Sequence, residues 1–496
     1  MYRLVDSMCD ILRKEAAFSA AKAIPPAKPN MTCSDWKRSI LVLATCLFGL
    51  AAAGHGQTAT QPLLQDIKVA RDNNYSASPS ATPFVQKTGS VMPAAAPVNP
   101  VRTLFPALAD VEIPGYSGVV VESLDGKVVL EANADGLFNP ASNVKIATAY
   151  AILKTFGPEF RFISNIYTDG TIDRATGTLV GNVYVSGKDP MFGYQHAIMV
   201  ANELNKMGIS SVSGDLVVTD NFVMNYSASP QRSGDTLFAA MDASKRPAAA
   251  TRDWGNYLSY SGKYGQVNAI PSVTFTGAMY VQPIPSNVHL LFTHESAPIR
   301  EILKVTLCYS NNFLAERLGD MLGGPYAVAR LVQLNAGIQP QEFSLATASG
   351  LGYNRVSPNA MMKLLHVLRS DLARYRMTFA DIMPVAGIDK GTLENRFDTD
   401  FSVGSVVGKT GTLGVTDSGV SALSGEINTR NGRYLFVIFN QRGRVAKFRS
   451  FQNYFVSLVQ GQFGGPVRVT YDAQSLETRL ARSRVSYPTS RVGYVN

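Results

Sequence analysis

The chain has 496 residues, of which 46% are hydrophobic and 17% are charged, and its formal net charge is +9. This length exceeds that of a single compact domain, and the composition suits a well-cored globular protein. The basic residues are scattered, with mild clusters only at 442–449 and 479–491, whereas nucleic-acid-binding surfaces gather Lys and Arg among aromatic residues. We therefore expect no nucleic-acid partner.

The N-terminal region has the layout of an export signal. Lys37 and Arg38 precede an apolar run at 40–53, which closes on three alanines, and this order is typical of secretory signals. Because a membrane span needs ~20 apolar residues, we expect cleavage near Ala53 and a periplasmic or otherwise extracytoplasmic protein. An uncleaved membrane anchor is the alternative. Residues 1–53 are thus predicted to be an N-terminal extension and signal peptide, with Met31 as a candidate start.

Residues 54–100 are rich in Ala, Ser, Thr, Pro, Asn and Gln and show no sustained hydrophobic period. A segment of this kind cannot bury enough apolar surface to fold. We predict a disordered linker here, with folded structure beginning near Val101.

Cysteine and histidine are too sparse in the predicted mature chain to build a disulfide framework or a metal centre. Of the four cysteines only Cys308 follows the predicted signal, and the five histidines form no H-E-x-x-H or other recognised ligand spacing. We therefore predict no metal site and no cofactor.

The first strand patterns lie at 118–123 and 127–131. They flank the dipeptide Asp-Gly at 125–126, a turn signal that predicts a β-hairpin. A polar loop follows this hairpin before the next apolar run.

An alanine-rich run at 146–156 predicts a buried helix that opens at Ser142. Ser142 and Lys145 are three positions apart, close to one helical turn, and so face the same side. A serine hydroxyl becomes a nucleophile when a base removes its proton, and a buried neutral lysine can be that base. The helix N-terminus adds N–H groups where an oxyanion would develop. Alone, S-x-x-K is weak, because Ser142 could simply cap the helix and 34–37 repeats the spacing.

Two further motifs strengthen this interpretation. The sequence Ser310-Asn311-Asn312 lies within a helical stretch at 298–318, and Lys409-Thr410-Gly411-Thr412 follows a strand-like run at 403–407. Each is weak alone, since 357–359 repeats S-x-N in a turn and K-T-G-T could end an ordinary strand. Because all three motifs occur in order, at a helix start, a helix-flanking loop and a strand, we interpret them as one active site.

The ordered set S-x-x-K, S-x-N and K-T-G resembles that of serine penicillin-binding proteins and serine β-lactamases. More closely, the chain resembles the D-alanyl-D-alanine carboxypeptidase/endopeptidase family, which is peptidase family S13 or the low-molecular-mass class C penicillin-binding proteins. The phrases that carry the resemblance span about 115–463 and lie at 139–145, 294–304, 308–316, 348–351, 383–387 and 408–412.

The resemblance implies an α/β (α+β) sandwich of the serine β-lactamase/DD-peptidase type, an antiparallel sheet covered by helices. Its catalytic domain would comprise 101–163 and 291–468, followed by a C-terminal tail at 469–496. Strand patterns at 419–427 and 434–440, joined by an Asn-Gly turn, and an amphipathic helix at 448–463 would complete the sandwich.

The long gap between Ser142 and Ser310 predicts an inserted domain at 164–290 after the nucleophile helix. We predict that this insert is mainly β, with short strands such as 179–186 and 214–219 and one helical run at 197–206.

By this resemblance the site residues acquire roles. Ser142 would attack the carbonyl between two D-alanines with Lys145 as general base, and the N–H groups of Ser142 and Thr412 would form the oxyanion hole. Ser310 would relay a proton to the leaving amine, and Asn312 would hold the substrate backbone. The K-T-G-T residues would bind the terminal carboxylate, and the charge of Lys409 would also lower the pKa of Lys145; these residues are Lys409, Thr410, Gly411 and Thr412. An alternative register, Tyr309-Ser310-Asn311, matches the Y-x-N of class C β-lactamases and related esterases.

We expect a carboxypeptidase, with endopeptidase activity as a further possibility, that acts on peptidoglycan stem peptides ending in D-Ala-D-Ala and is covalently inhibited by β-lactams. A β-lactamase or esterase of the same superfamily is one alternative, and a catalytically silent wall-binding protein is another. The intact motifs argue against a silent protein. The oligomeric state stays open.

Overall fold

The computed structural model describes residues 99–263 and 270–488, which belong to one compact unit at 95–496. The predicted signal at 1–53 and all but the end of the predicted linker at 54–100 lie outside the described residues, so both stay predictions. Within the described ranges, no helix is both long enough and apolar enough to cross a bilayer.

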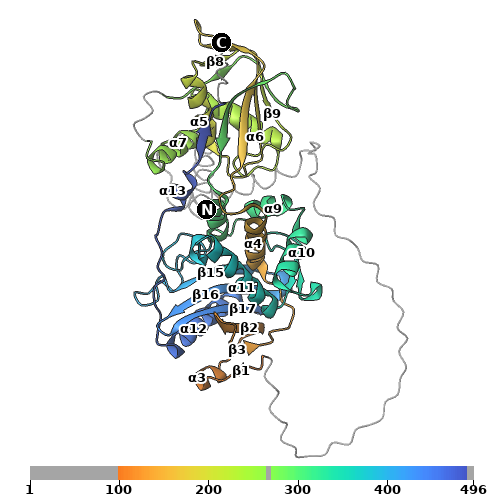
Figure 1. The fold of residues 1–496 in the computed structure, drawn as a ribbon, viewed down its shortest axis with the longest axis vertical. Coiled ribbons are helices and arrows are strands. Elements are labelled where there is room, and N and C mark those ends of the chain that lie inside the picture. The colour runs from red at the N-terminus through yellow and green to blue at the C-terminus, as the bar shows by residue number, and fades with distance from the viewer. Residues whose placement is uncertain (1–98, 264–269, 489–496) are drawn as a thin grey trace, which may run out of the picture. The chain divides into compact units, whose positions relative to one another are not determined.

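A six-stranded antiparallel sheet, built from strands near both ends of the described chain, forms the centre of the lower part of the fold in Figure 1. Its strand order is β1-β3-β2-β17-β16-β15, so β15 lies at one edge. The predicted hairpins at 118–131 and 419–440 are confirmed as β2/β3 and β16/β17. The strands are β1 (Arg102–Thr103), β2 (Tyr116–Ser123), β3 (Val128–Ala132), β15 (Val406–Leu413), β16 (Val420–Thr429) and β17 (Gly432–Gln441).

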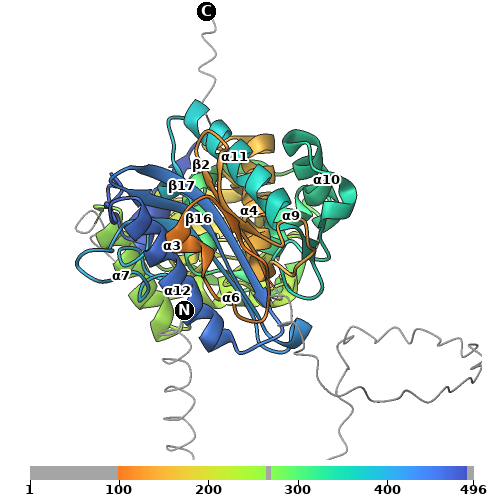
Figure 2. The same cartoon turned by 90° about the horizontal axis from the view of Figure 1, so that it is seen from below.

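Helices cover both faces of this sheet (Figures 1 and 2). On one face lie α4 (Val144–Phe156), α8 (Ile299–Cys308), α9 (Asn312–Asp320), α10 (Pro325–Ala336) and α11 (Pro358–Arg374). On the other lie α3 (Pro106–Ala109) and α12 (Val445–Gln462), and α12 confirms the predicted closing helix. Successive strand side chains point to opposite faces, so Val120 packs towards α4 and α11 while Val119 and Val121 pack towards α12.

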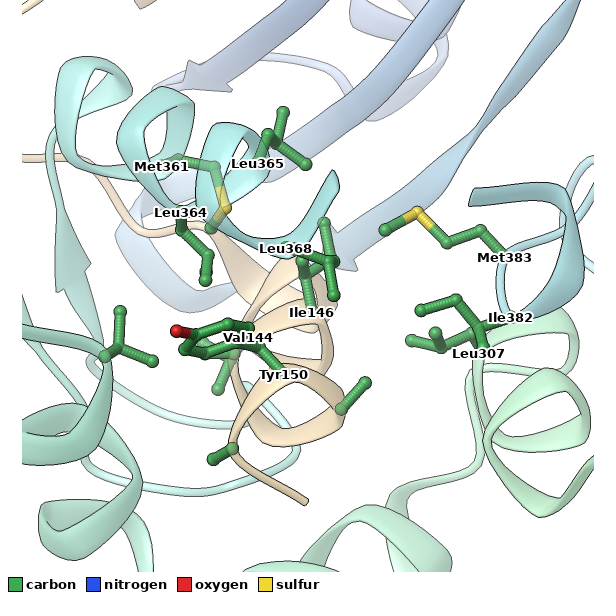
Figure 3. Packing of buried hydrophobic residues seen from close by; sticks show 14 of the residues in the cluster. Val144, Ile146, Tyr150, Leu307, Met361, Leu364, Leu365, Leu368, Ile382 and Met383 are labelled. Atoms are coloured by element: carbon green, nitrogen blue, oxygen red, sulfur yellow. The ribbon is translucent and has the colours of Figure 1, made fainter. Parts of the chain in front are cut away.

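The core on the α4 face surrounds α4, the predicted nucleophile helix (Figure 3). Every residue of α4 from Val144 to Leu153 is buried, because sheet, helices and loops enclose the helix. Figure 3 shows side chains of α4 meeting those of α11 and of two neighbouring segments, namely Val144, Ile146, Tyr150, Leu307, Met361, Leu364, Leu365, Leu368, Ile382 and Met383. Dense packing of this kind transmits small volume changes, so the position of α4 is fixed by its surroundings.

The region between α4 and α8 has its own sheets and its own buried cluster, drawn from 166–292 together with Ala481. One sheet has the order β11-β9-β7-β4-β12-β18, and a smaller one has the order β10-β8-β6-β5. Its strands are β4 (Ile163–Thr168), β5 (Thr171–Asp173), β6 (Thr178–Val180), β7 (Val183–Gly187), β8 (Ser211–Val212), β9 (Leu216–Val218), β10 (Thr274–Phe275), β11 (Met279–Val281), β12 (His289–Glu295) and β18 (Arg484–Ser486).

The prediction of a single helix in this region is wrong. Besides α5 (Tyr194–Lys206), which matches the predicted run, the structure contains α6 (Pro230–Met241) and α7 (Ala248–Tyr260). The buried side of α6 is built largely from small residues, Ser233, Gly234 and Ala240 among them. The larger buried residues Leu237 and Met241 nevertheless recur at helical spacing, so the sequence did contain a periodic signal for this helix.

The chain segments that lead into and out of the region between α4 and α8 meet at Phe162 and Ser296. The Phe162 amide donates to Ser296 Oγ at 2.9 Å, and the Ser296 amide donates to the Phe162 carbonyl at 2.9 Å. The C-terminal residues that we predicted to be a tail add a strand to the larger sheet of this region, because β18 pairs with β12. The short helix α13 (Leu476–Leu480) precedes this strand. The predicted domain boundaries themselves stay a prediction.

Candidate active site

The turn around Ser142, the predicted nucleophile (the nucleophile turn), has a strained backbone. A 3₁₀ turn at Ala141–Asn143 leads directly into α4, so the predicted helical start at Ser142 is confirmed. Ala141 has a φ of 46°, which is the left-handed region that non-glycine residues rarely adopt. The loop around Gly350 presses on this turn, because a Cβ at Gly350 would lie 1.9 Å from the Ala141 carbonyl oxygen.

Lys145 makes three close polar contacts from the first turn of α4. Its Nζ lies 3.0 Å from Ser142 Oγ, 2.8 Å from Asn312 Oδ1 and 2.6 Å from the Ser349 carbonyl oxygen. Asn312 Oδ1 and the carbonyl can only accept. A neutral amine has two N–H donors and one lone pair, so donating to these two oxygens leaves the lone pair facing the Ser142 hydroxyl. This is the arrangement that a general base requires.

The environment of Lys145 favours the neutral amine. The side chain is only 1% exposed, and burial lowers its pKa from 10.5 to about 7, against the opposing charge of Glu316. Removing an ammonium group from water disfavours its charged form. At neutral pH a large fraction of Lys145 is therefore unprotonated and able to accept a proton.

The S-x-N motif lies at a break between α8 and α9. Ser310 has a φ of 54°, and this left-handed residue redirects the chain. The side chain of Asn311 caps α9 by accepting from the Leu314 amide at 3.0 Å, whereas Asn312 is the first residue of α9 and reaches Lys145. Of the two asparagines, Asn312 therefore faces Lys145, as the S-x-N register requires.

The K-T-G-T residues lie in the edge strand β15, beside the nucleophile turn. A Cβ at Gly411 would meet the Pro140 carbonyl oxygen at 2.7 Å, so glycine allows this close approach. The Lys409 side chain is fully buried and its Nζ donates to the Thr410 carbonyl at 2.7 Å. Thr412 is exposed, and its hydroxyl accepts from an Arg449 guanidinium N–H at 3.0 Å.

Two buried lysines share this site. Burial and the charge of Lys145 both lower the pKa of Lys409 well below its ordinary value. Two ammonium groups in one low-dielectric site repel each other, so the site disfavours having both charged at once. An incoming carboxylate would reverse this for its nearest lysine, because an adjacent negative charge favours the protonated amine.

Sequence reasoning missed several residues that build the site. Buried Asn139 donates to the Gly352 carbonyl at 2.8 Å and to Asp417 Oδ2 at 2.8 Å, and Asp417 also binds Arg355. Asn139 therefore ties the loop at 350–353 and the turn after β15 to the nucleophile turn. The phrases N-P-A-S and A-S-G-L contain Asn139 and Ser349, but their role depends on contacts between distant segments.

A family model, the D-Ala-D-Ala carboxypeptidase 3 (S13) family, matches residues 103–258 and 267–455. A D-alanyl-D-alanine carboxypeptidase of Actinomadura sp. (strain R39) is 24% identical over 420 residues, which are 65% of this chain and 77% of that protein. The D-alanyl-D-alanine carboxypeptidase DacB of Haemophilus influenzae is 22% identical over 414 residues, covering 65% and 84%.

Solved structures show the same fold. The penicillin G-acylated Bd3459 predatory endopeptidase of Bdellovibrio bacteriovorus superposes with a TM-score of 0.62 at 23% identity, covering 72% of this chain and 95% of that one. The matched fold is the serine β-lactamase-like sandwich expected from the sequence, and the family model covers most of the chain. The chain belongs to the D-Ala-D-Ala carboxypeptidase 3 (S13) family of serine peptidases.

Proposed function

We propose that the chain is an exported D-alanyl-D-alanine carboxypeptidase/endopeptidase that cleaves peptidoglycan stem peptides through an acyl-enzyme on Ser142. The observation that carries this proposal is the set of contacts of Lys145, which combine a buried amine, a lone pair facing Ser142 and fixed acceptors on its two N–H groups. This is the geometry of a serine nucleophile with its own base.

Acylation would proceed by proton transfer and addition. Ser142 Oγ forms a bond to the carbonyl carbon of the penultimate D-alanine while its proton passes to Lys145 Nζ. The negative charge on the carbonyl oxygen is held by the Ser142 and Thr412 amides. Collapse breaks the C–N bond, and the proton on Lys145 reaches the leaving amine through the hydroxyl of Ser310. Water then attacks the ester, with the same groups acting in reverse, and releases the acid.

Substrate orientation would come from β15 and Asn312. The outer edge of β15 is bonded to 384–386 as far as Gly408, and an extended peptide would pair with the part of the strand that follows. Buried Lys409 supplies a positive charge for the terminal carboxylate, which the hydroxyls of Thr410 and Thr412 also bind. The Asn312 amide, already fixed by its contact with Lys145, would hold the substrate backbone.

β-Lactams would be covalent inhibitors of this site. The penicillin-acylated state of the Bdellovibrio endopeptidase supports this extension to the present chain. A penicilloyl ester on Ser142 forms by the same addition step, with the ring amide as the leaving group. Export is supported by the basic and apolar layout at 37–53, since peptidoglycan lies outside the cytoplasm.

Incubation of the purified protein with benzylpenicillin tests the proposal. Mass spectrometry should show one intact penicillin adduct per chain, located on the peptide that contains Ser142. Ser142→Ala should carry no adduct. An adduct on another residue, or none in the wild type, would refute the assignment of Ser142 as nucleophile.

A further inference from the structure

The Ser349 carbonyl that accepts a hydrogen bond from Lys145 belongs to the loop Ala348–Gly350. Glu316 of α9, a residue with no assigned role, binds this loop. Glu316 Oε2 accepts from the Ala348 amide at 3.1 Å, and Oε1 accepts from the Ser349 amide at 3.0 Å. The carboxylate thus spans two consecutive peptide N–H groups. Charge-assisted bonds of this kind are among the stronger hydrogen bonds in proteins.

The same two peptide groups bind α4 through their carbonyls. The Ala348 carbonyl accepts from the Thr148 hydroxyl at 2.7 Å, and the Ser349 carbonyl accepts from Lys145 Nζ at 2.6 Å. Ala348 and Ser349 are fully buried. The segment therefore lies between α9 and α4, with its N–H groups fixed by one helix and its carbonyls by the other.

Close packing supports this connection. Gly319 lies one helical turn after Glu316 in α9, and a Cβ there would fall 2.4 Å from the Ala348 Cβ. The next residue of the loop, Gly350, presses on the nucleophile turn at the Ala141 carbonyl. A displacement of this loop would therefore reach both the base and the turn that carries the nucleophile.

Electrostatics gives Glu316 a second effect on the same lysine. Burial lowers the pKa of Lys145, and the negative charge of Glu316 opposes this shift. No other anion acts comparably on Lys145 within the described residues, and the second buried cation, Lys409, lies in the same site.

We propose that Glu316 is a positioning residue for the general base: it fixes the Ser349 carbonyl that orients the Lys145 amine, and its carboxylate charge acts on the same amine. This inference rests on the proposed function, in which Ser142 is acylated and Lys145 is the general base.

Three variants separate the two effects. Glu316→Gln keeps the shape but removes the charge and leaves only one accepting oxygen for two N–H groups. Glu316→Asp keeps the charge but shortens the side chain, so that it cannot span both amides. Glu342→Gln is the matched control. The Glu342 carboxylate also accepts a backbone N–H, from Gln339, but it lies in the separate 3₁₀ turn Pro340–Glu342 and makes no contact with Lys145 among those of the described residues.

The measurement is the rate constant of acylation by a fluorescent penicillin across a pH series. The rate constant is fitted to the time course of labelling until labelling is complete. Unfolded protein then lowers the final amount of label and leaves the rate constant unchanged. Loss of an oriented charge-assisted bond should lower the rate constant roughly tenfold in both Glu316 variants. In Glu316→Gln alone, the acid limb should also move down by about one pH unit, because removing an anion lowers the pKa of a nearby lysine.

Each outcome is informative. Glu342→Gln should match the wild type. Wild-type rates and an unmoved acid limb in Glu316→Gln would overturn the inference, and so would a slower rate with an unmoved limb, which is what a purely structural role would give. Loss of folding in both Glu316 variants would likewise overturn it, by showing that the carboxylate serves the fold. Absence of labelling in the wild type would instead refute the proposed function.

Discussion

Asn312 Oδ1 lies 2.8 Å from Lys145 Nζ, although the two residues are 167 positions apart in the chain. The contact joins the break between α8 and α9 to the first turn of α4. Adjacent Asn311 turns its side chain away and caps α9. The two neighbouring asparagines therefore have different contacts: Asn312 binds Lys145, and Asn311 caps α9.

This division predicts opposite effects for two neighbouring substitutions. Asn312→Ala removes an acceptor from the Lys145 amine, so we expect penicillin acylation to slow by roughly tenfold or more with little change in stability. Asn311→Ala removes a helix cap and should cost about 1 kcal/mol of unfolding free energy while acylation is largely kept. Labelling kinetics and urea unfolding of both variants check this. The reverse pattern would favour the Y-x-N register.

The requirement for a neutral base predicts that arginine cannot replace Lys145. A guanidinium stays protonated at any accessible pH, so Lys145→Arg should lose about 10²–10⁴-fold in acylation rate. Lys154→Arg is the control, because Lys154 lies on the same helix and forms an ion pair with Asp371. Fluorescent penicillin labelling should be unchanged in this control. Substantial labelling of Lys145→Arg would show that another group takes the proton.

The lowered pKa of Lys145 predicts the pH dependence of acylation. The amine is a base only when unprotonated, and its pKa is about 7 instead of 10.5. The rate should therefore fall roughly tenfold per unit below pH 7 and level off above it. Acylation rates measured from pH 5 to pH 9, each normalised to the final labelling, test this. A rate still rising steeply at pH 9 would mean that Lys145 keeps an ordinary pKa.

The insert should be separable from the catalytic chemistry. Its ends meet at Phe162 and Ser296, and its buried cluster is largely its own. Replacing 163–295 by a short linker, with the chain ended after Arg482 because β18 would lose its partner, should leave Ser142 open to penicillin. Labelling of the shortened and full chains compares them. A shortened protein that folds but is never acylated would show that the insert shapes the site.

The sequence predicted those parts of the fold that depend on neighbouring residues, such as tight turns and apolar runs. Asp-Gly and Asn-Gly turns identified both hairpins, and the apolar run after Ser142 identified helix α4. It did not reveal the roles of Ser349 and Glu316, because their contacts join segments that are far apart; Lys145 and Ser349 are separated by 204 positions. Helices α6 and α7 were missed although a signal was present, since the buried residues of α7, Ala250, Trp254, Tyr257 and Leu258, recur at helical spacing.

The most direct test of the central claim compares two turnovers in one preparation. Activating water against a penicilloyl ester needs a base on its open face, and the candidate carboxylate after Asn312, Glu316, is engaged by two backbone amides. We therefore predict that the wild type releases D-alanine from a D-Ala-D-Ala stem-peptide mimic over many cycles, holds benzylpenicillin as a persistent adduct on Ser142, and loses both properties in Ser142→Ala. Rapid penicillin hydrolysis without D-alanine release would contradict the account and identify a β-lactamase.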